Sequence, residues 1–223
     1  MSTPALIALL WLLFAITHVG MSSLRWRPRL VAALGEGPFR GLYSLVSLVI
    51  FVPLVSIYLG DRHSGAYLGS LAGLPGMRPV MYVGMGLALT LMVGGLRSPA
   101  PTSFLPGPAE ARGVLRVTRH PLLMGLGLFG LLHLAVVAVN TAELAFFGGF
   151  PLFVALGCWH QDQRKLAEGD ADFGRFHAAT PFLPLPTPAA VVAAVREQPL
   201  EVGIGIAATV GLRFLHPVWF GVG

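Results

Sequence analysis

The sequence predicts an all-α protein, a polytopic transmembrane helical bundle of about six spans. Hydrophobic residues make up 55% of its 223 residues and charged residues only 11%, whereas a soluble domain carries roughly a quarter charged residues. The mean hydropathy of +0.74 points the same way. No long polar stretch remains for a second domain, so residues 1–223 are expected to form a single integral membrane domain.

Six apolar runs approach the length of about 20 residues that a helix needs to cross a hydrocarbon core of ~30 Å. These runs cover residues 4–21, 42–60, 79–96, 121–140, 144–159 and 200–220. The fifth run is short, and the sixth contains Arg213 and His216, which leaves open whether it crosses fully.

The basic residues predict the orientation. Twelve of the 15 basic residues fall in the loops after the first, third and fifth runs, whereas the loops on the other side hold only Arg62 and Arg78. The positive-inside rule therefore places the N-terminus outside and the three basic loops in the cytoplasm, in the inner (cytoplasmic) membrane. This topology explains the net charge of +5 without a nucleic-acid partner.

Two histidines lie inside charge-free runs, His18 in the first and His133 in the fourth. An ionisable ring in lipid is costly and marks a candidate functional site when a partner can be named. Two neutral imidazoles on different helices could be the axial ligands of a haem iron. In the alternative interpretation, both histidines are structural, and their imidazoles form hydrogen bonds with backbone carbonyl groups. The single cysteine, Cys158, excludes a multi-cysteine metal site.

The two histidines are expected at different depths. His18 precedes the basic edge at Arg25 by seven residues, or ~10 Å, and His133 follows Pro121 by twelve, or ~18 Å. The difference of ~8 Å exceeds what a typical helix tilt of ~20° readily absorbs.

The residues before the fourth run predict an anion site. Arg116, Arg119 and His120 precede a helix N-terminus, whose amides also face an incoming anion. They are candidates to bind haem propionates or another phosphate- or carboxylate-bearing cofactor. A plain positive-inside anchor explains them equally. An ionic network with residues 162–165 is also expected.

The remaining features have less specific interpretations. Glycines 125, 127 and 130 leave one side of the fourth run almost without side chains, which would suit a flat macrocycle or, in the preferred interpretation, close helix packing. His160 and His177 are expected at the surface or at an interface, and His63 in an outer loop. His216, with Arg213 in the last run, is a further candidate to contact a cofactor.

Several sequence blocks together resemble the NnrU family. They are FAITHVGMSSLR (14–25), GEGPFRGLYSLVSL (35–48), LRVTRHPLLMG (115–125), LLHLAV (131–136), WHQDQRKL (159–166) and, as a weaker match, FLHP (214–217). NnrU-like proteins are found beside nitrite and nitric oxide reductases in denitrifying bacteria. The plant 15-cis-ζ-carotene isomerases carry a similar domain and are haem b membrane enzymes.

The resemblance implies haem b as the cofactor, with His18 and His133 as the axial ligands of its iron. It also places a cysteine implicated in ligand exchange at Gly130, so this chain departs from the isomerases there. A more distant likeness, through RHPLLMG (119–125) and DFGRFHAATPFLP (172–184), is to isoprenylcysteine carboxyl methyltransferases. Leu123 and Gln161 replace residues expected of their cofactor site.

Three functions are therefore weighed. The preferred one is a haem b membrane protein that supports nitric oxide or nitrite reduction, with a membrane reductase or electron donor as partner. The alternative is a haem-dependent cis–trans isomerase of 15-cis-ζ-carotene, with a carotenoid substrate. The second alternative is a membrane methyltransferase. Whether the protein is catalytic stays open. All three functions require the protein to lie in a lipid bilayer.

Overall fold

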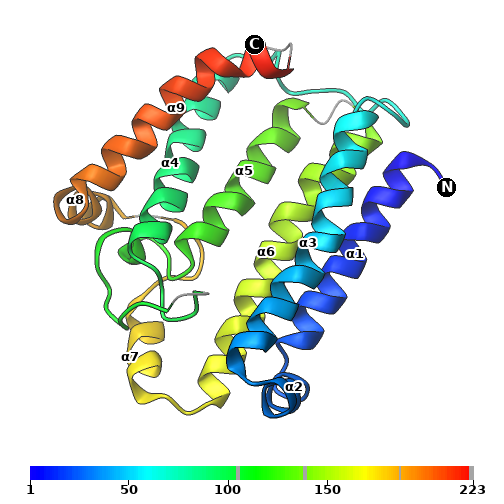
Figure 1. The fold of residues 1–223 in the computed structure, drawn as a ribbon. Coiled ribbons are helices and arrows are strands. Elements are labelled where there is room, and N and C mark those ends of the chain that lie inside the picture. Colours follow the sequence, from blue (N-terminus) through cyan, green and yellow to red (C-terminus); the bar gives the residue numbers. More distant parts are fainter. Residues whose placement is uncertain (104–105, 138–139, 186, 221–223) are drawn as a thin grey trace. The chain divides into compact units, whose positions relative to one another are not determined.

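The computed structural model describes residues 1–103, 106–137, 140–185 and 187–220, and within these ranges the regular structure is helical (Figure 1). An isolated bridge joins Tyr67 to Asn140. The elements are α1 (Thr3–Met21), α2 (Arg27–Leu34), α3 (Glu36–Gly60), α4 (Met77–Arg97), η1 (Gly113–Arg116, a 3-10 turn), α5 (Pro121–Val137), α6 (Thr141–Ala167), α7 (Ala171–Ala179), α8 (Pro188–Glu197) and α9 (Pro199–Phe220). The all-α prediction is confirmed.

Five of these helices, α1, α3, α4, α6 and α9, are long and apolar enough to cross a membrane, and α5 is a shorter apolar helix. The protein is thus a multi-pass membrane protein in a lipid bilayer. The second predicted run begins earlier, as α3 at Glu36. The fifth becomes α6, with 27 residues, or ~40 Å, because its polar last turns continue the helix beyond the apolar stretch. The fourth contains α5, with 17 residues, and residues 138–139 of this run lie outside the described residues.

The chain divides into two compact units, Met1–Gly73 with His133–His160, and Leu74–Leu132 with Gln161–Gly223. The boundaries fall inside α5 and α6, so each of these helices contributes to both units.

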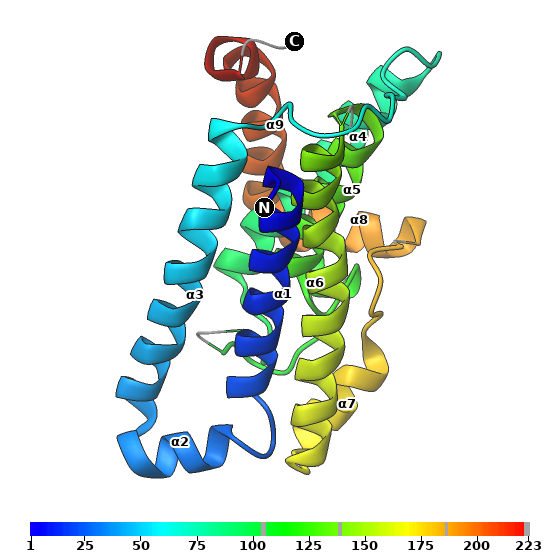
Figure 2. The ribbon, with the colours of Figure 1, turned by 90° about the vertical axis from the view of Figure 1, so that its right-hand side faces the viewer.

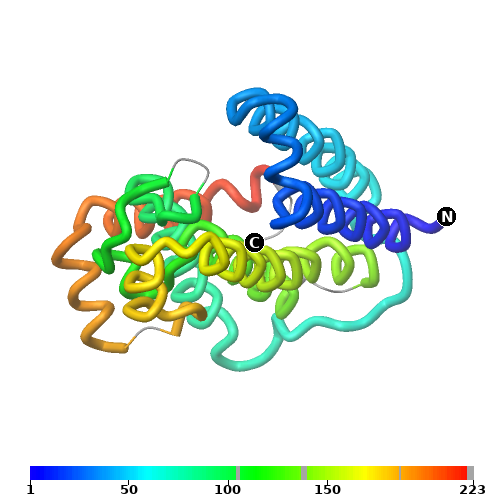
Figure 3. The backbone as a smooth tube through the Cα atoms, turned by 90° about the horizontal axis from the view of Figure 1, so that it is seen from below, coloured from blue at the N-terminus to red at the C-terminus, as the bar shows by residue number. Residues whose placement is uncertain are grey.

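In the first unit, α1 packs along α3, and the short helix α2 joins their ends (Figure 2 and Figure 3). The Trp11 ring of α1 meets the rings of Phe51 on α3 and Phe150 on α6, with centroids 5.8 and 5.1 Å away. Its Nε1 donates to the Phe146 carbonyl oxygen at 3.1 Å. Gly149 makes room for this ring, since a Cβ there would lie 2.1 Å from Trp11 Cε2.

The start of α6 is fixed by a cap and by the loop that precedes α4. Asn140 Oδ1 accepts hydrogen bonds from the backbone N–H groups of Ala142 and Glu143, and Glu143 Oε2 accepts one from the Asn140 N–H. His63 Nδ1 lies 3.2 Å from the buried Glu143 carboxylate. This reciprocal capping satisfies the free amides of the first turn, which explains why the helix begins at Thr141 rather than at 144.

In the second unit, α4 and α9 lie side by side (Figure 1). Gly205 of α9 permits the close approach, since a Cβ there would lie 2.4 Å from Thr90 Oγ1. Arg213 of α9 donates from Nε to the Tyr82 hydroxyl of α4 at 2.6 Å. The sixth predicted run is therefore a continuous helix, and its arginine has a hydrogen-bond partner.

Candidate functional site

His18 is held in one tautomer by Ser47 of α3. Its Nδ1 lies 3.2 Å from Ser47 Oγ, and that hydroxyl donates to the Tyr43 carbonyl oxygen at 2.9 Å. A hydroxyl has one proton, so Ser47 Oγ can only accept the proton of His18 Nδ1–H. The lone pair of the imidazole is therefore on Nε2, the arrangement found in metal-binding histidines whose other nitrogen is hydrogen-bonded.

Aromatic rings surround His18. Phe14 stacks on it at a centroid distance of 5.2 Å, Tyr43 lies at 4.4 Å, and Phe153 of α6 presents its edge at 5.2 Å. The Tyr43 hydroxyl also donates to the His18 carbonyl oxygen at 3.3 Å. The imidazole thus sits in a largely apolar, ordered environment formed by α1, α3 and α6.

His133 belongs to the same compact unit as His18. It stacks on Phe147 of α6, with centroids 4.8 Å apart and planes 20° apart. Phe147 and the His18 neighbour Phe153 are separated by six residues, or about 9 Å along α6. The predicted ligands His18 and His133 therefore both contact phenylalanine rings of α6, at different positions along the helix.

His160, expected at the surface or at an interface, is partly buried on α6. Its Nε2 is buried and has no hydrogen-bond partner among the described residues. The sequence contained a signal for this, because Phe146, Phe153 and His160 recur every seven residues and so lie on one face of α6.

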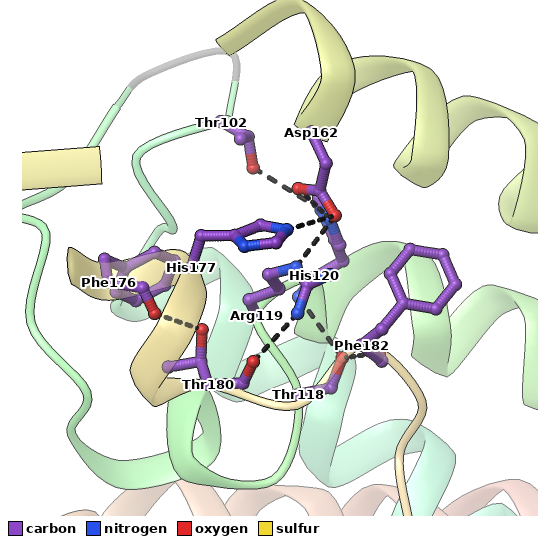
Figure 4. A network of polar contacts seen from close by, with 9 residues as sticks. All are labelled: Thr102, Thr118, Arg119, His120, Asp162, Phe176, His177, Thr180 and Phe182. Carbon is purple, nitrogen blue, oxygen red and sulfur yellow. Dashed lines mark hydrogen bonds and ion pairs between the residues drawn. The ribbon is translucent and has the colours of Figure 1, made fainter. Parts of the chain in front are cut away.

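A second polar cluster surrounds the buried carboxylate of Asp162 (Figure 4). Arg119 Nε donates to Oδ2 at 2.8 Å, and His120 Nε2 donates to Oδ1 at 2.9 Å. The side chains of Asp162 and His120 are 2% and 1% exposed. His177 Nε2 lies 3.8 Å from Oδ2, at the more exposed edge of the cluster. The predicted ionic network is confirmed for Asp162.

This cluster joins the start of α5 to the segment after α7. Arg119 donates from its side chain to the Thr180 carbonyl oxygen at 2.8 Å and from its backbone N–H to that of Pro181 at 2.9 Å. Thr118 Oγ1 donates to the Phe182 carbonyl oxygen at 2.6 Å. Buried ion pairs are tolerated when hydrogen bonds complete their coordination, and here they do.

The remaining basic residues of the predicted network have other partners. Arg116 pairs with Glu197 at 2.9 Å, whereas Arg164 and Lys165 pair with Glu168. The Arg116 guanidinium and the Gly113 N–H, at 2.6 Å, hold the pKa of the Glu197 carboxyl below its usual value. Arg119 and His120 thus both bind the carboxylate of Asp162, whereas Arg116 binds the carboxylate of Glu197.

A family profile described as "NnrU protein" matches residues 6–223. The chain belongs to the NnrU family. Two curated proteins named "15-cis-zeta-carotene isomerase, chloroplastic" are similar to it, one from Arabidopsis thaliana (26% identical, covering 96% of this chain and 60% of the relative) and one from Zea mays (24%, 97% and 61%). This NnrU chain therefore spans about 60% of the length of these relatives. No solved structure gives a significant match.

One of the glycines of the NnrU chain has a clear packing role. A Cβ at Gly125 would lie 2.6 Å from the Ala88 carbonyl oxygen of α4. Backbone of α4 therefore occupies the space beside this glycine, as the close-packing interpretation predicted.

Proposed function

We propose that this NnrU-family protein binds haem b and isomerises a cis double bond in a polyene of the ζ-carotene type. The observation that carries the proposal is the contact of His18 Nδ1 with Ser47, which assigns the imidazole lone pair to Nε2, beside the ring of Tyr43. Two isomerase relatives that align with nearly the whole chain support the reaction class.

The residues around His18 fit an axial ligand of haem iron. A ligand must be a neutral imidazole with a free lone pair, and its orientation is usually fixed through its other nitrogen. Ser47 provides that contact, and the rings of Phe14 and Phe153 pack against the imidazole. The resemblance to the isomerases proposes His133 as the second ligand. Arg116, Arg119 and His120 were proposed for the propionates, and their polar groups have partners within the protein.

When bound, haem b would supply a redox-active Lewis-acidic centre for a reaction that leaves the atom and electron count of the substrate unchanged. The protein contributes an apolar setting suited to a long hydrocarbon. The enclosure of His18 is built from aromatic side chains, which match a conjugated polyene better than a polar acceptor. On this proposal the protein is an enzyme, and it lies in the cytoplasmic membrane with its basic loops inside.

The role in nitric oxide or nitrite reduction rests on the family resemblance, and it predicts a membrane reductase or electron donor as partner. It shares the haem proposal but needs no polyene substrate. The methyltransferase alternative needs a complete cofactor site near Arg119 and His120, and both side chains are bonded to Asp162. Isomerisation is therefore the function that we favour.

The test uses the purified full-length protein in nanodiscs, reconstituted with haem b. The wild type should show the absorption spectrum of six-coordinate haem and convert added 15-cis-ζ-carotene, followed by chromatography under oxidising and reducing conditions. His18→Ala should lose both properties, whereas His63→Ala, in the outer loop, should retain both. A wild type without a Soret band would reject the haem proposal. A wild type that binds haem but leaves the carotene unchanged would favour the role in nitric oxide chemistry.

A further inference from the structure

The buried Nε2 atom of His160 lacks a hydrogen-bond partner among the described residues. Nearly all buried polar side-chain atoms in folded proteins have a partner, so an exception calls for an explanation such as a ligand or an ordered molecule at that position. An imidazole nitrogen can either donate or accept, and it can therefore serve a ligand that offers an oxygen.

His160 lies on the face of α6 that His18 contacts. It follows Phe153 by seven residues, which is almost two full turns, so both side chains leave the helix in nearly the same direction. Phe153 is the residue whose edge meets the His18 ring. It is displaced from Phe153 by about 10 Å along α6, toward the C-terminal end of the helix.

Gly157 leaves one position on this face of α6 without a side chain. Gly157 lies between Phe153 and His160, and a Cβ placed on it would meet only Phe153 Cζ, at 3.9 Å. Gly157 therefore places no side chain on this face between Phe153 and His160.

We infer that His160 donates a hydrogen bond from Nε2 to a carboxylate of the ligand held at His18, which for haem b is a propionate. This inference rests on the proposed function. The propionates hang from one edge of the macrocycle, away from the iron. A donor that serves them must therefore be displaced from the axial ligand, as His160 is. The predicted topology also puts His160 on the cytoplasmic side of His18, where a carboxylate is nearer to water.

The other candidate hydrogen-bond donors already bind carboxylates of the protein, which favours His160 as the donor to a propionate. Arg119 and His120 donate to Asp162, and Arg116 donates to Glu197. Recruiting any of them to a propionate would break an ion pair within the protein. His160 Nε2 can bind a carboxylate without breaking a contact that the described residues make.

The experiment compares haem b with its dimethyl ester, which lacks the propionate charges, in full-length protein in nanodiscs. Wild type, His160→Phe and His160→Gln are titrated with each compound, and the Soret band gives both the Kd and the coordination state. Phe keeps the ring without a donor, whereas Gln restores an N–H donor. Because a hydrogen bond to a charged group is lost, His160→Phe should bind haem b about tenfold or more weakly. It should bind the ester as the wild type does, and His160→Gln should recover most of the affinity.

Three results would overturn the inference. Equal losses of affinity for haem b and for the ester would mean that His160 supports the fold rather than the carboxylate. A five-coordinate spectrum in His160→Phe would make His160 an iron ligand instead. Unchanged binding in both variants would show that the ligand does not reach Nε2. A wild type without any Soret band rejects the proposed function itself, and this inference with it.

Discussion

Ser47 leaves His18 a single way to form their hydrogen bond: the Nδ1–H group donates to Ser47 Oγ, because the hydroxyl proton is already bound to the Tyr43 carbonyl oxygen. A serine on α3 thereby determines which nitrogen of a histidine on α1 can face a ligand. The relationship links two helices that are separated by α2 in the sequence.

Replacing Ser47 should weaken haem binding without removing the iron ligand. In Ser47→Ala the imidazole loses the acceptor that orients it, and such outer contacts are worth 10- to 100-fold in metal affinity. We expect the Kd for haem b to rise on the order of tenfold in a Soret titration. Ser56→Ala is the matched control, since Ser56 also donates to the carbonyl oxygen four residues earlier on α3 and is exposed. Equal effects of the two variants would contradict this role.

Asp162→Asn should destabilise the fold strongly. The substitution leaves the buried Arg119 guanidinium without a counter-charge, and breaking a buried pair costs about 3–5 kcal/mol. The matched control is Asp172→Asn, because Asp172 pairs with Arg175 at an exposed position, where such a pair contributes about 0–1 kcal/mol. Thermal unfolding in detergent, followed by circular dichroism, should show a large drop for the first variant and little change for the second.

Gly149→Ala should destabilise the first unit. The added Cβ would lie 2.1 Å from the Trp11 ring, and overpacking of this kind typically costs about 1–3 kcal/mol. Gly148→Ala is its control in the adjacent position, because a Cβ there would meet only Leu134 Cδ2, at 4.0 Å. Its higher helix propensity should leave the unfolding temperature unchanged or raised. A larger loss in Gly148→Ala would refute the packing of Trp11 against α6.

The contact between Glu197 and Arg116 predicts acid sensitivity in the second unit. The pKa of Glu197 is lower in the folded protein than its ordinary value of 4.5. Its carboxylate therefore stabilises the fold above pH ~4.5, and this contribution is lost as the pH falls toward the lower folded pKa. The unfolding temperature of the wild type should exceed that of Glu197→Gln at pH 7, and the gap should narrow below pH 4.5. A gap that stays constant with pH would exclude this linkage.

Much of the architecture follows directly from the sequence. In a bilayer every backbone polar group must be satisfied internally, so long apolar runs have to be helices. The positions of five long apolar helices and of the shorter α5 therefore agree with the predicted runs. The proximity of Arg119 and His120 to Asp162 was also predictable, since charged residues that flank adjacent spans tend to pair where they leave the lipid.

Other features depend on contacts between distant residues. The start of α6 is set by Asn140 capping and by the loop that carries His63, and periodicity alone did not indicate either contact. His160 was expected at the surface or at an interface. Its buried nitrogen became evident only from the packing of α6.

The sequence by itself determined that this is a helical membrane protein with His18 and His133 in apolar runs, because hydropathy and charge are local properties of the chain. Only the tertiary structure decided that Ser47 fixes the tautomer of His18 and that Nε2 of His160 is left without a protein partner. These properties depend on which side chains meet across α1, α3 and α6, and hydrogen-bond partners that are separated by 29 residues, as His18 and Ser47 are, leave no periodic pattern in the chain.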